Sequence, residues 1–258
     1  MKNELEKQLE KFYDSLSSDY HLIYQNWEAS IDRQSKKIDE LIQKYSKIKA
    51  KNILDCTCGI GTQALGLSQL GYKVYGTDKS TESIKRAKEE AKKRNLSMAF
   101  TAVDLRELKD AVNAPIDVII SFDNSLPHIL ERKELLKGVE NIHSILKTNN
   151  LFIGSVRDYD KLLEEQPKST NPVISDKEGS RTITFQIWDW KEDASYIVNH
   201  FTLKEIGNDI QVKRRKVEYR AYSRLELTNI FKEGGFRQID WLMPKETDFY
   251  QPIFVCVK

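Results

Sequence analysis

Apolar positions in the first part of the chain follow two alternating patterns. Short continuous apolar runs, typical of strands buried on both faces, alternate with segments in which apolar residues recur every three or four positions, typical of amphipathic helices. The strand-like runs are 52–56, 73–78, 98–104, 117–122 and 151–156, and the helix-like segments between them are 62–71, 80–94 and 131–146. This alternation predicts an α/β fold with a mostly parallel sheet and helices on both of its faces.

After Arg157 the pattern changes to strands without helices between them. The strand-like runs 182–190, 196–206 and 210–222 predict an antiparallel β cap. The polar segment 166–180 in front of them is expected to be an exposed and mobile loop. A helical segment at 223–236 and strand-like runs at 237–242 and 253–258 then restore the α/β pattern and complete the sheet.

The N-terminal 50 residues show helical spacing with no strand before them. Two helices are expected, from Glu4 to Leu16 and from Trp27 to Tyr45. The expected domain organisation follows from these patterns. It consists of an N-terminal helical segment covering the active site (1–50), an α/β domain (51–160 and 221–258), and an antiparallel β cap that forms the substrate region (161–220).

Composition excludes several classes of function. The 258-residue chain has 41 Lys and Arg against 39 Asp and Glu, a net charge of only +2, so dependence on nucleic acid is not expected. It lacks an apolar run of the roughly 20 residues that a membrane span needs, and its N-terminus lacks the apolar core of a secretion signal. We therefore expect a cytoplasmic protein with no membrane contact. Cys56, Cys58 and Cys256 form an odd set without a second Cys/His pair, so no metal site is predicted.

Candidate chemistry gathers at the ends of three successive strands. Gly59 and Gly61 follow the first strand and allow the backbone to turn sharply and to approach a ligand. Asp78 ends the second strand, where a carboxylate can bind both hydroxyls of a ribose. Asp104 and Leu105 end the third, where a polar and an apolar group suit an adenine. This spacing also resembles the dinucleotide fingerprint, whose third glycine position is Ala64 here, so an NAD-dependent oxidoreductase stays open as an alternative.

The segment L-D-C-T-C-G-I-G-T (54–62) resembles the first motif of class I S-adenosylmethionine methyltransferases. The resemblance implies a Rossmann-like seven-stranded sheet with an antiparallel last strand. It also implies S-adenosylmethionine as cofactor and S-adenosylhomocysteine as product. Gly59 and Gly61 would lie at the methionine moiety, Asp78 at the ribose, and Asp104 with Leu105 around the adenine. The predicted cofactor site also includes Trp27, Arg33, Asp55, Lys79 and Phe122.

Three further segments resemble glycine and sarcosine N-methyltransferases: F-D-N-S-L-P-H (122–128), V-R-D-Y-D (156–160) and Y-D-S-L-S-S-D-Y-H-L-I-Y (13–24). This resemblance implies that Asn124 and Arg157 hold an amino acid substrate and that Arg33 binds the carboxylate of the cofactor. Aromatic residues of the methyl-transfer chamber would correspond to Tyr13, Tyr24, Tyr222 and Tyr250. Of these residues, Asn124, Arg157, Tyr24 and Tyr222 are the predicted catalytic set, and Tyr13, Asn124, Arg157, Tyr222 and Tyr250 the predicted substrate-binding set.

These residue types suit the transfer of a methyl group to an amino acid. The planar fork of Arg157 matches a carboxylate, and the side-chain carbonyl of Asn124 can accept a hydrogen bond from an amine. Each also has a structural alternative. Arg157 can pair with Asp158 or Asp160 at the surface, Asn124 can form a turn, and His128 can act as a base or bond to the backbone. Trp188 and Trp190 face the same way on one strand and are expected in a core or a dimer contact.

We therefore predict an S-adenosylmethionine-dependent methyltransferase that N-methylates glycine, sarcosine or a related small amine. Two alternatives remain at this stage: O- or N-methylation of another small metabolite, and a non-catalytic protein that binds the cofactor. The expected partner is a small-molecule substrate, and a homo-oligomer is compatible with the sequence.

Overall fold

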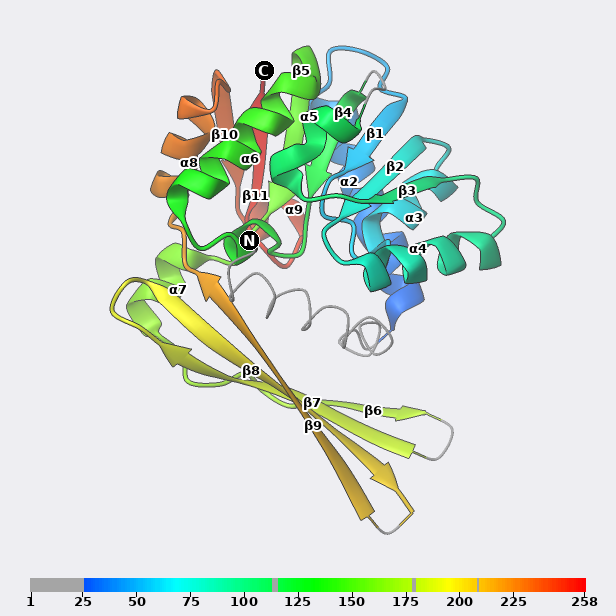
Figure 1. Ribbon diagram of the computed structural model, residues 1–258, viewed down its shortest axis with the longest axis vertical. Helices are drawn as coiled ribbons and strands as arrows, with labels where there is room; N and C mark the ends of the chain where they lie inside the picture. Colours follow the sequence, from blue (N-terminus) through cyan, green and yellow to red (C-terminus); the bar gives the residue numbers. More distant parts are fainter. Residues whose placement is uncertain (1–25, 113–115, 178–179, 208) are drawn as a thin grey trace.

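The computed structural model describes residues 26–112, 116–177, 180–207 and 209–258, and these residues form two sheets (Figure 1). The larger has seven strands in the order β10-β11-β5-β4-β1-β2-β3. Its strands are β1 (Asn52–Asp55), β2 (Lys73–Asp78), β3 (Ala99–Ala102), β4 (Ile116–Ser121), β5 (Leu146–Ser155), β10 (Gln238–Leu242) and β11 (Ile253–Val257). Strands β1 to β5 pair in parallel, and β11 pairs antiparallel with both β5 and β10. The predicted α/β fold, seven-stranded sheet and antiparallel last strand are therefore confirmed.

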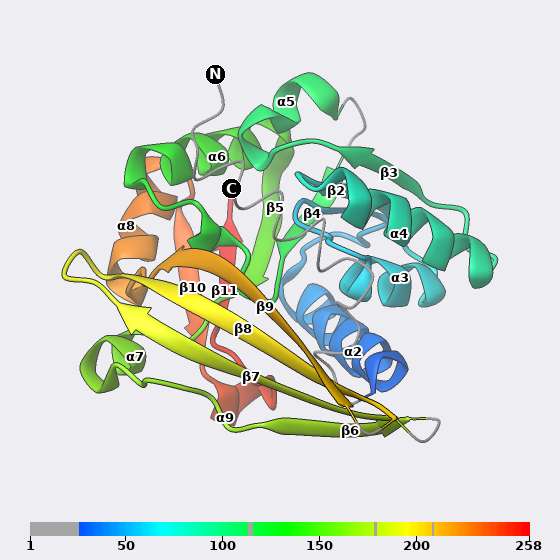
Figure 2. The ribbon, with the colours of Figure 1, turned by 60° about the horizontal axis from the view of Figure 1, so that its bottom comes forward.

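Helices cover both faces of this sheet because its central strands are apolar on both sides (Figures 1 and 2). Ile53 packs with the side that carries α2 (Trp27–Tyr45), α3 (Thr62–Gln69) and α4 (Thr81–Lys93). Leu54, the next residue, packs with the opposite side, where α5 (Leu108–Ala111), α6 (Arg132–Ile145) and α8 (Arg224–Glu233) lie. Short helices η2 (Leu105–Glu107), η3 (Leu126–His128), α7 (Tyr159–Glu165) and α9 (Pro244–Thr247) join the larger elements.

Helix α2 has the bounds that its apolar spacing predicts. Its first residues are capped by Asn26, whose side chain accepts a hydrogen bond from the N–H of Ala29. The helix packs closely against α3 at Gly66, where an added Cβ would lie only 2.5 Å from the Ser35 hydroxyl. This close approach places the first half of α2 beside the loop that leads from β1 into α3. The predicted helix from Glu4 to Leu16 lies outside the described residues.

The second sheet contains β6 (Val173–Lys177), β7 (Ser180–Trp190), β8 (Ser195–Ile206) and β9 (Asp209–Arg220), all antiparallel in this order. It extends away from the α/β body as a long twisted ribbon (Figure 1). The predicted loop at 166–180 is wrong in part, because Val173–Lys177 pairs with β7 along its whole length. Its polar composition concealed a strand that lies at the edge of the sheet, where polar residues are common.

No helix within these described ranges is both long and apolar enough to span a membrane.

Candidate active site

The loop that leads from β1 into α3 is hydrogen-bonded to the end of the neighbouring strand β2. Gly59 and Gly61 adopt positive φ angles of 53° and 96°, which residues with a Cβ rarely adopt. The N–H of Cys58 donates to the carbonyl of Thr77, and the N–H of Gly59 donates to Oδ2 of Asp78 at 2.8 Å. An added Cβ at Gly59 would meet nothing within 4 Å, so this backbone borders open space. The glycine loop therefore presents its backbone to a ligand at the carboxyl edge of the sheet.

Asp55 lies at the end of β1 with an unusual electrostatic environment. Its side chain is buried, and only Oδ1 has a hydrogen bond, a long one of 3.4 Å from the N–H of Thr57. Oδ2 is buried and has no hydrogen-bond partner among the residues that the structure describes. Burial raises the pKa of Asp55 well above its ordinary value, the N–H of Thr57 opposes the rise, and the charges of Asp78 and Asp123 add to it. A buried acceptor of this kind fits a cationic donor group of a ligand.

The predicted adenine residues are held by protein contacts. Oδ1 of Asp104 accepts from Nε of Arg106 at 2.9 Å, and Oδ2 accepts from Nη2 at 2.7 Å. Burial raises the pKa of Asp104, but the hydrogen bonds from Arg106 outweigh it, so the net shift is downward. Lys79 lies 3.9 Å from the same carboxylate. Leu105 packs under α6 so closely that a Cβ added to Gly138 would lie 2.0 Å from it. Contacts of either residue with adenine stay a prediction.

Three other predicted cofactor residues lie on or near α2. Nε1 of Trp27 donates to the hydroxyl of Thr62 at the start of α3, at 2.9 Å. Phe122 is buried and makes an edge-to-face contact with Phe249, with ring centroids 5.5 Å apart. Arg33 is exposed, and its guanidinium donates to the hydroxyl of Ser30, on the buried face of α2, at 3.5 Å. A contact of Arg33 with the cofactor stays a prediction.

Arg157 follows β5 and is enclosed by aromatic side chains of the second sheet. Its guanidinium carbon lies 4.7 Å from the ring centroid of Trp188 and 5.1 Å from that of Tyr219. Its Nη1 donates to the hydroxyl of Tyr196 at 2.7 Å, and this hydroxyl also bonds to that of Tyr159 at 3.0 Å. Burial alone would lower the pKa of Arg157, but the hydroxyls of Tyr196, Tyr219 and Tyr159 hold it above its ordinary value. The group stays cationic.

No acidic side chain among the described residues pairs with Arg157. The predicted alternative, an ion pair with Asp158 or Asp160, is wrong because both carboxylates bind Arg224, at 2.6 and 2.9 Å. A largely enclosed guanidinium without a counter-ion is costly in a protein unless an anion joins it. Arg157 therefore fits an anionic ligand group at this place.

Asn124 lies beside Arg157 and has features of both roles that the sequence predicts for it, a turn former and a ligand of the substrate. Its backbone is in the left-handed region, with a φ of 65°, as in a turn. Its Oδ1 accepts a hydrogen bond from the backbone N–H of Arg157 at 3.0 Å, whereas its buried Nδ2 makes no hydrogen bond of normal geometry within the described ranges. The Asn124 side chain is close enough to the hydroxyl of Tyr159 to oppose the rise in the pKa of that group. The Nδ2 group is a donor, which suits a carboxylate better than an amine.

His128 stacks on Tyr219 at a ring-centroid distance of 4.1 Å. Burial first, and then the charge of Arg157, lower the pKa of His128 to about 3. A histidine with such a pKa stays neutral and is a weak base at neutral pH.

The predicted tyrosines have different environments. Tyr222 is fully buried in the core, and its hydroxyl donates to the carbonyl of Ile129 at 2.7 Å. Tyr250 is exposed, stacks on Phe249, and its hydroxyl donates to Asp123. Tyr13 and Tyr24 lie outside the described residues. The roles of these tyrosines in a methyl-transfer chamber stay predictions.

The aromatic residues that contact or flank Arg157 were largely missed from the sequence. Trp188 was expected in a core, and it is buried, but it also covers the guanidinium. Tyr196 and Tyr219 had no predicted role. They pair across β8 and β9, with Trp188 and Trp190 one strand further on. Their common feature is alternation: every second residue of these strands faces the α/β body.

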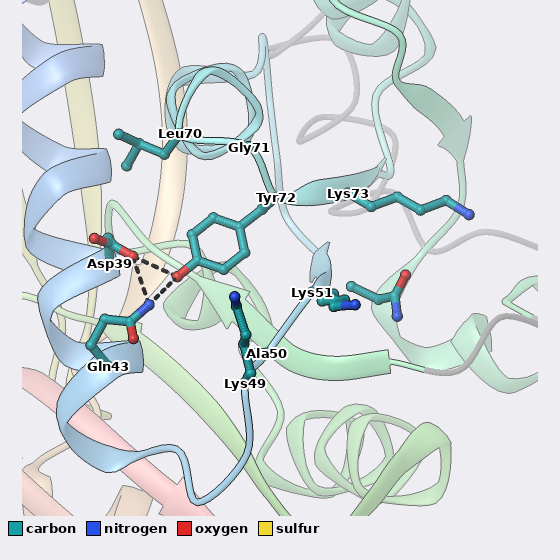
Figure 3. A pocket seen from close by; sticks show the side chains of 10 residues that line it. Asp39, Gln43, Lys49, Ala50, Lys51, Leu70, Gly71, Tyr72 and Lys73 are labelled. Carbon is teal, nitrogen blue, oxygen red and sulfur yellow. Dashed lines mark hydrogen bonds between the residues drawn. The ribbon is translucent and has the colours of Figure 1, made fainter.

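A pocket of about 590 Å³ lies at the opposite edge of the sheet (Figure 3). It contains the first residues of β1 and β2, Asn52 and Lys73, together with Lys49 and Lys51. Its acidic residue, Asp39, accepts hydrogen bonds from Tyr72 and Gln43. Ligands of open α/β sheets bind at the carboxyl ends of the strands, so this pocket is separate from the candidate site.

Comparisons with known proteins agree with the fold and the glycine loop. Residues 53–149 match a family model described as a methyltransferase domain. A glycine/sarcosine N-methyltransferase of Halorhodospira halochloris is 26% identical over 225 residues, which cover 83% of this chain and 82% of the relative.

Two solved structures share the fold. An S-adenosylmethionine-dependent methyltransferase of Clostridium acetobutylicum superposes with a TM-score of 0.70 and 18% identity, covering 87% of this chain and 90% of that protein. CalS10 is an amino pentose methyltransferase of Micromonospora echinaspora that was solved with S-adenosylmethionine bound. It superposes with a TM-score of 0.73 and 13% identity, covering 88% of this chain and 91% of that protein.

The sheet order and the glycine loop are those of the class I methyltransferase fold, and the matched domain makes the chain a methyltransferase with S-adenosylmethionine as its cofactor. Its sequence relatives include glycine/sarcosine N-methyltransferases. The residues present fit this cofactor. Gly59 borders open space, Asp78 ends β2, and the buried Oδ2 of Asp55 suits the ammonium group of a methionine moiety. When bound, the cofactor supplies the electrophilic methyl group.

Proposed function

We propose that the enzyme methylates the amine of a small amino acid, with glycine and sarcosine as the leading candidates. The observation that carries the proposal is the enclosed guanidinium of Arg157, which has no acidic partner in the described part of the chain. The name of the relative from Halorhodospira halochloris points to the same substrates.

The donors around Arg157 suit a carboxylate rather than another anion of larger size. The guanidinium offers a planar fork, and the buried Nδ2 donor of Asn124, which makes no hydrogen bond of normal geometry in the part of the chain that the structure describes, follows the adjacent strand β4. The backbone N–H of Arg157 donates to Oδ1 of Asn124, and this hydrogen bond holds the two residues at a fixed distance. Together they would bind the carboxylate of the substrate and leave its amine free to face the methyl donor.

Methyl transfer to an amine is an in-line displacement that needs an uncharged nitrogen lone pair. The substrate ammonium first releases its proton to solvent water, and the protein's contribution is then to align the neutral amine with the methyl group and to exclude water during transfer. The rings of Trp188 and Tyr219 lie over the guanidinium and cover part of it, which leaves the remainder accessible to a ligand. Neutral His128 leaves Arg157 as the cation there.

The proposal is tested by replacing Arg157 and by varying the acceptor. Arg157→Ala should lower kcat/KM for glycine or sarcosine by about 100-fold or more, because a charged pair in an enclosed site contributes about 3 kcal/mol or more. The affinity for S-adenosylhomocysteine should stay near that of the wild type. Arg157→Lys should recover only part of the loss, because the ammonium group lacks the fork.

Arg224→Ala is a matched control, since Arg224 lies close by but pairs with Asp158 and Asp160. It should reduce thermal stability slightly and leave KM for the acceptor unchanged. Ethanolamine, which lacks the carboxylate, should be a poor acceptor for wild type and Arg157→Ala alike. An unchanged KM for glycine and sarcosine in Arg157→Ala would overturn the proposal. Turnover only with acceptors that lack a carboxylate would favour another small metabolite as substrate, and binding of the cofactor without any turnover would favour a non-catalytic protein.

A further inference from the structure

The second sheet has one face that is both apolar and exposed. Alternate residues of a strand point to opposite faces, and Trp188, Tyr196 and Tyr219 mark the face of this sheet that meets the α/β body. The alternate residues form the opposite face, which we call the outer face. One row of the outer face crosses all four strands and is entirely aliphatic: Ile174, Ile183, Leu203 and Val212. Polar residues are usual on the solvated face of an antiparallel sheet, so this row is exceptional.

Several side chains of the outer face are open to solvent. Ile174 and Val212 are each 57% exposed, and Ile210, the next residue of β9 on this face, is 60% exposed. The adjoining row contains Phe185 and Phe201, whose rings stack with centroids 5.1 Å apart. Contiguous exposed apolar side chains mark a surface that binds another molecule or a membrane.

Charged residues flank the apolar rows and differ in sign at the two ends. Next to the aliphatic row on one side, Arg181 pairs with Asp176 at 3.2 Å and with Glu205 at 3.4 Å, so one carboxylate charge is left over. On the other side, Arg214 and Lys216 follow Val212 along the outer face of β9. Neither cation has an acidic partner within the described ranges, and Arg214 donates to a neutral amide instead.

Acidic residues one row beyond Lys216 do not change this polarity. Asp189 accepts from the side-chain amide of Asn199, and Glu218 accepts from Lys191. The apolar rows therefore lie between an acidic end, at Asp176 and Glu205, and a basic end. Such a face is complementary to itself when one copy is turned end for end.

We propose that the outer face binds the outer face of a second copy of this chain, with a two-fold axis that runs across the strands. This rotation would place the aliphatic row of one copy on the phenylalanine row of the other. It would also bring Lys216 of one copy near the partner's Glu205, and by symmetry each such contact would occur twice. Charge complementarity thus favours a second copy over an uncharged surface as the occupant.

The size of the face suits a dimer. Four strands about 4.8 Å apart and a length of about 25 Å give a plan area of about 500 Å² on each copy, to which the relief of the side chains adds. A stable interface uses about 800 Å² of accessible surface on each partner, so the two are of the same order.

Pairing through the edge of the sheet is the less favourable way to join two copies. Strand β9 lies at the edge, and it contains the run Lys213, Arg214, Arg215 and Lys216. Antiparallel pairing of two β9 strands at this run would bring like charges together, which is a known protection of edge strands. The structure therefore favours packing of face on face.

The experiment measures the dissociation constant of the dimer by sedimentation equilibrium on the full chain. Val212→Lys places a cation among the apolar rows and near the partner's Arg214, and should raise this constant about 100-fold or more. Because Val212 is 57% exposed, the fold should survive, which circular dichroism checks. Leu225→Lys is the matched control, since Leu225 is 71% exposed on α8, away from the outer face. It should leave the dissociation constant unchanged.

Charge reversal tests the orientation of the two copies. Lys216→Glu should raise the dissociation constant about tenfold at low salt, and less at high salt, because it faces the partner's Glu205. Adding Glu205→Lys to the same chain should restore much of the lost affinity. A double variant weaker than Lys216→Glu would overturn the end-for-end arrangement.

Three other outcomes would overturn the proposal. They are a wild type that is monomeric at about 100 µM, a dimer that persists in folded Val212→Lys, and a monomeric wild type that binds phosphatidylglycerol vesicles through the same residues. The last would assign the face to a membrane surface. If Val212→Lys fails to fold, Ile174→Lys on the edge strand β6 takes its place. No cofactor or acceptor enters these measurements, so the result is independent of the proposed function.

Discussion

The two ends of the candidate site are built in different ways. At the cofactor end, Asp55, Gly59 and Asp78 lie at the ends of neighbouring strands β1 and β2, and one short loop joins them. At the acceptor end, Arg157 follows β5, but the groups around it come from α7, β7, β8 and β9, which belong mostly to the second sheet. The cofactor end depends on backbone geometry within one sheet, whereas the acceptor end depends on how two sheets meet.

This difference explains why the two ends should respond differently to substitution. The cofactor end presents backbone groups and carboxylates, so single side-chain changes there should alter ligand affinity in proportion to the hydrogen bonds removed. At the acceptor end, aromatic rings surround one cation, Arg157. Loss of this cation should weaken binding of the acceptor while the cofactor still binds. Both ends also contain buried polar atoms that make no hydrogen bond of normal geometry in the described residues, namely Oδ2 of Asp55 and Nδ2 of Asn124.

The largest effect on the cofactor side is expected from Asp78→Ala. Two hydrogen bonds from ribose hydroxyls to a carboxylate would be lost, which predicts a loss of about 100-fold in affinity for S-adenosylhomocysteine. Calorimetry measures the loss. Asp78→Asn keeps one acceptor oxygen and should lose less. Because Asp78 also accepts from Gly59 and Ser80, thermal unfolding of each variant must be recorded. A dissociation constant within about 3-fold of the wild type would contradict the predicted ribose contact.

A smaller effect is expected from pH through Asp55. Burial raises the pKa of Asp55 in the free protein, whereas a bound ammonium group would favour the ionised form. Binding should therefore release protons, and affinity should fall as the pH is lowered through the raised pKa, by at most about tenfold per pH unit. Calorimetry in buffers of different ionisation enthalpy measures the release. In the absence of ligand, the stability of the protein depends on pH in the opposite direction. The unfolded carboxyl ionises first, so the free energy of unfolding decreases as the pH rises through this interval.

Asp55→Asn is the control for this pH dependence. It removes the titrating group, so proton release should vanish and the affinity should become independent of pH in this range. Equal proton release in Asp55→Asn and the wild type would show that another group carries the linkage.

The smallest effect on activity is expected from Tyr222→Phe. The change removes the hydrogen bond to the carbonyl of Ile129, which predicts a loss of about 1 kcal/mol in the free energy of unfolding. Turnover should stay within about 2-fold of the wild type if the residue only packs in the core. Denaturant unfolding and steady-state kinetics separate the two effects. A large fall in kcat with unchanged stability would instead support the catalytic role predicted from the sequence.

By itself the sequence determined the fold class and much of the cofactor end. Apolar runs alternating with amphipathic segments predict a parallel sheet, and the bounds of α2 and the antiparallel final strand agree with the structure. The glycine loop and Asp78 were also predictable, because strand ends and positive φ angles depend on local residue types.

Tertiary structure decided the remaining features because they depend on contacts between distant segments. The strand β6 was hidden by its polar composition, since its pairing with β7 comes from the sheet. Which residues of α2 are buried depends on the rotation of the helix against α3, which Gly66 and Ser35 set by close packing. The absence of an acidic partner for Arg157 among the described residues depends on Arg224, 67 positions further along, which binds Asp158 and Asp160. Such competition between side chains for a partner is settled only when the chain is folded.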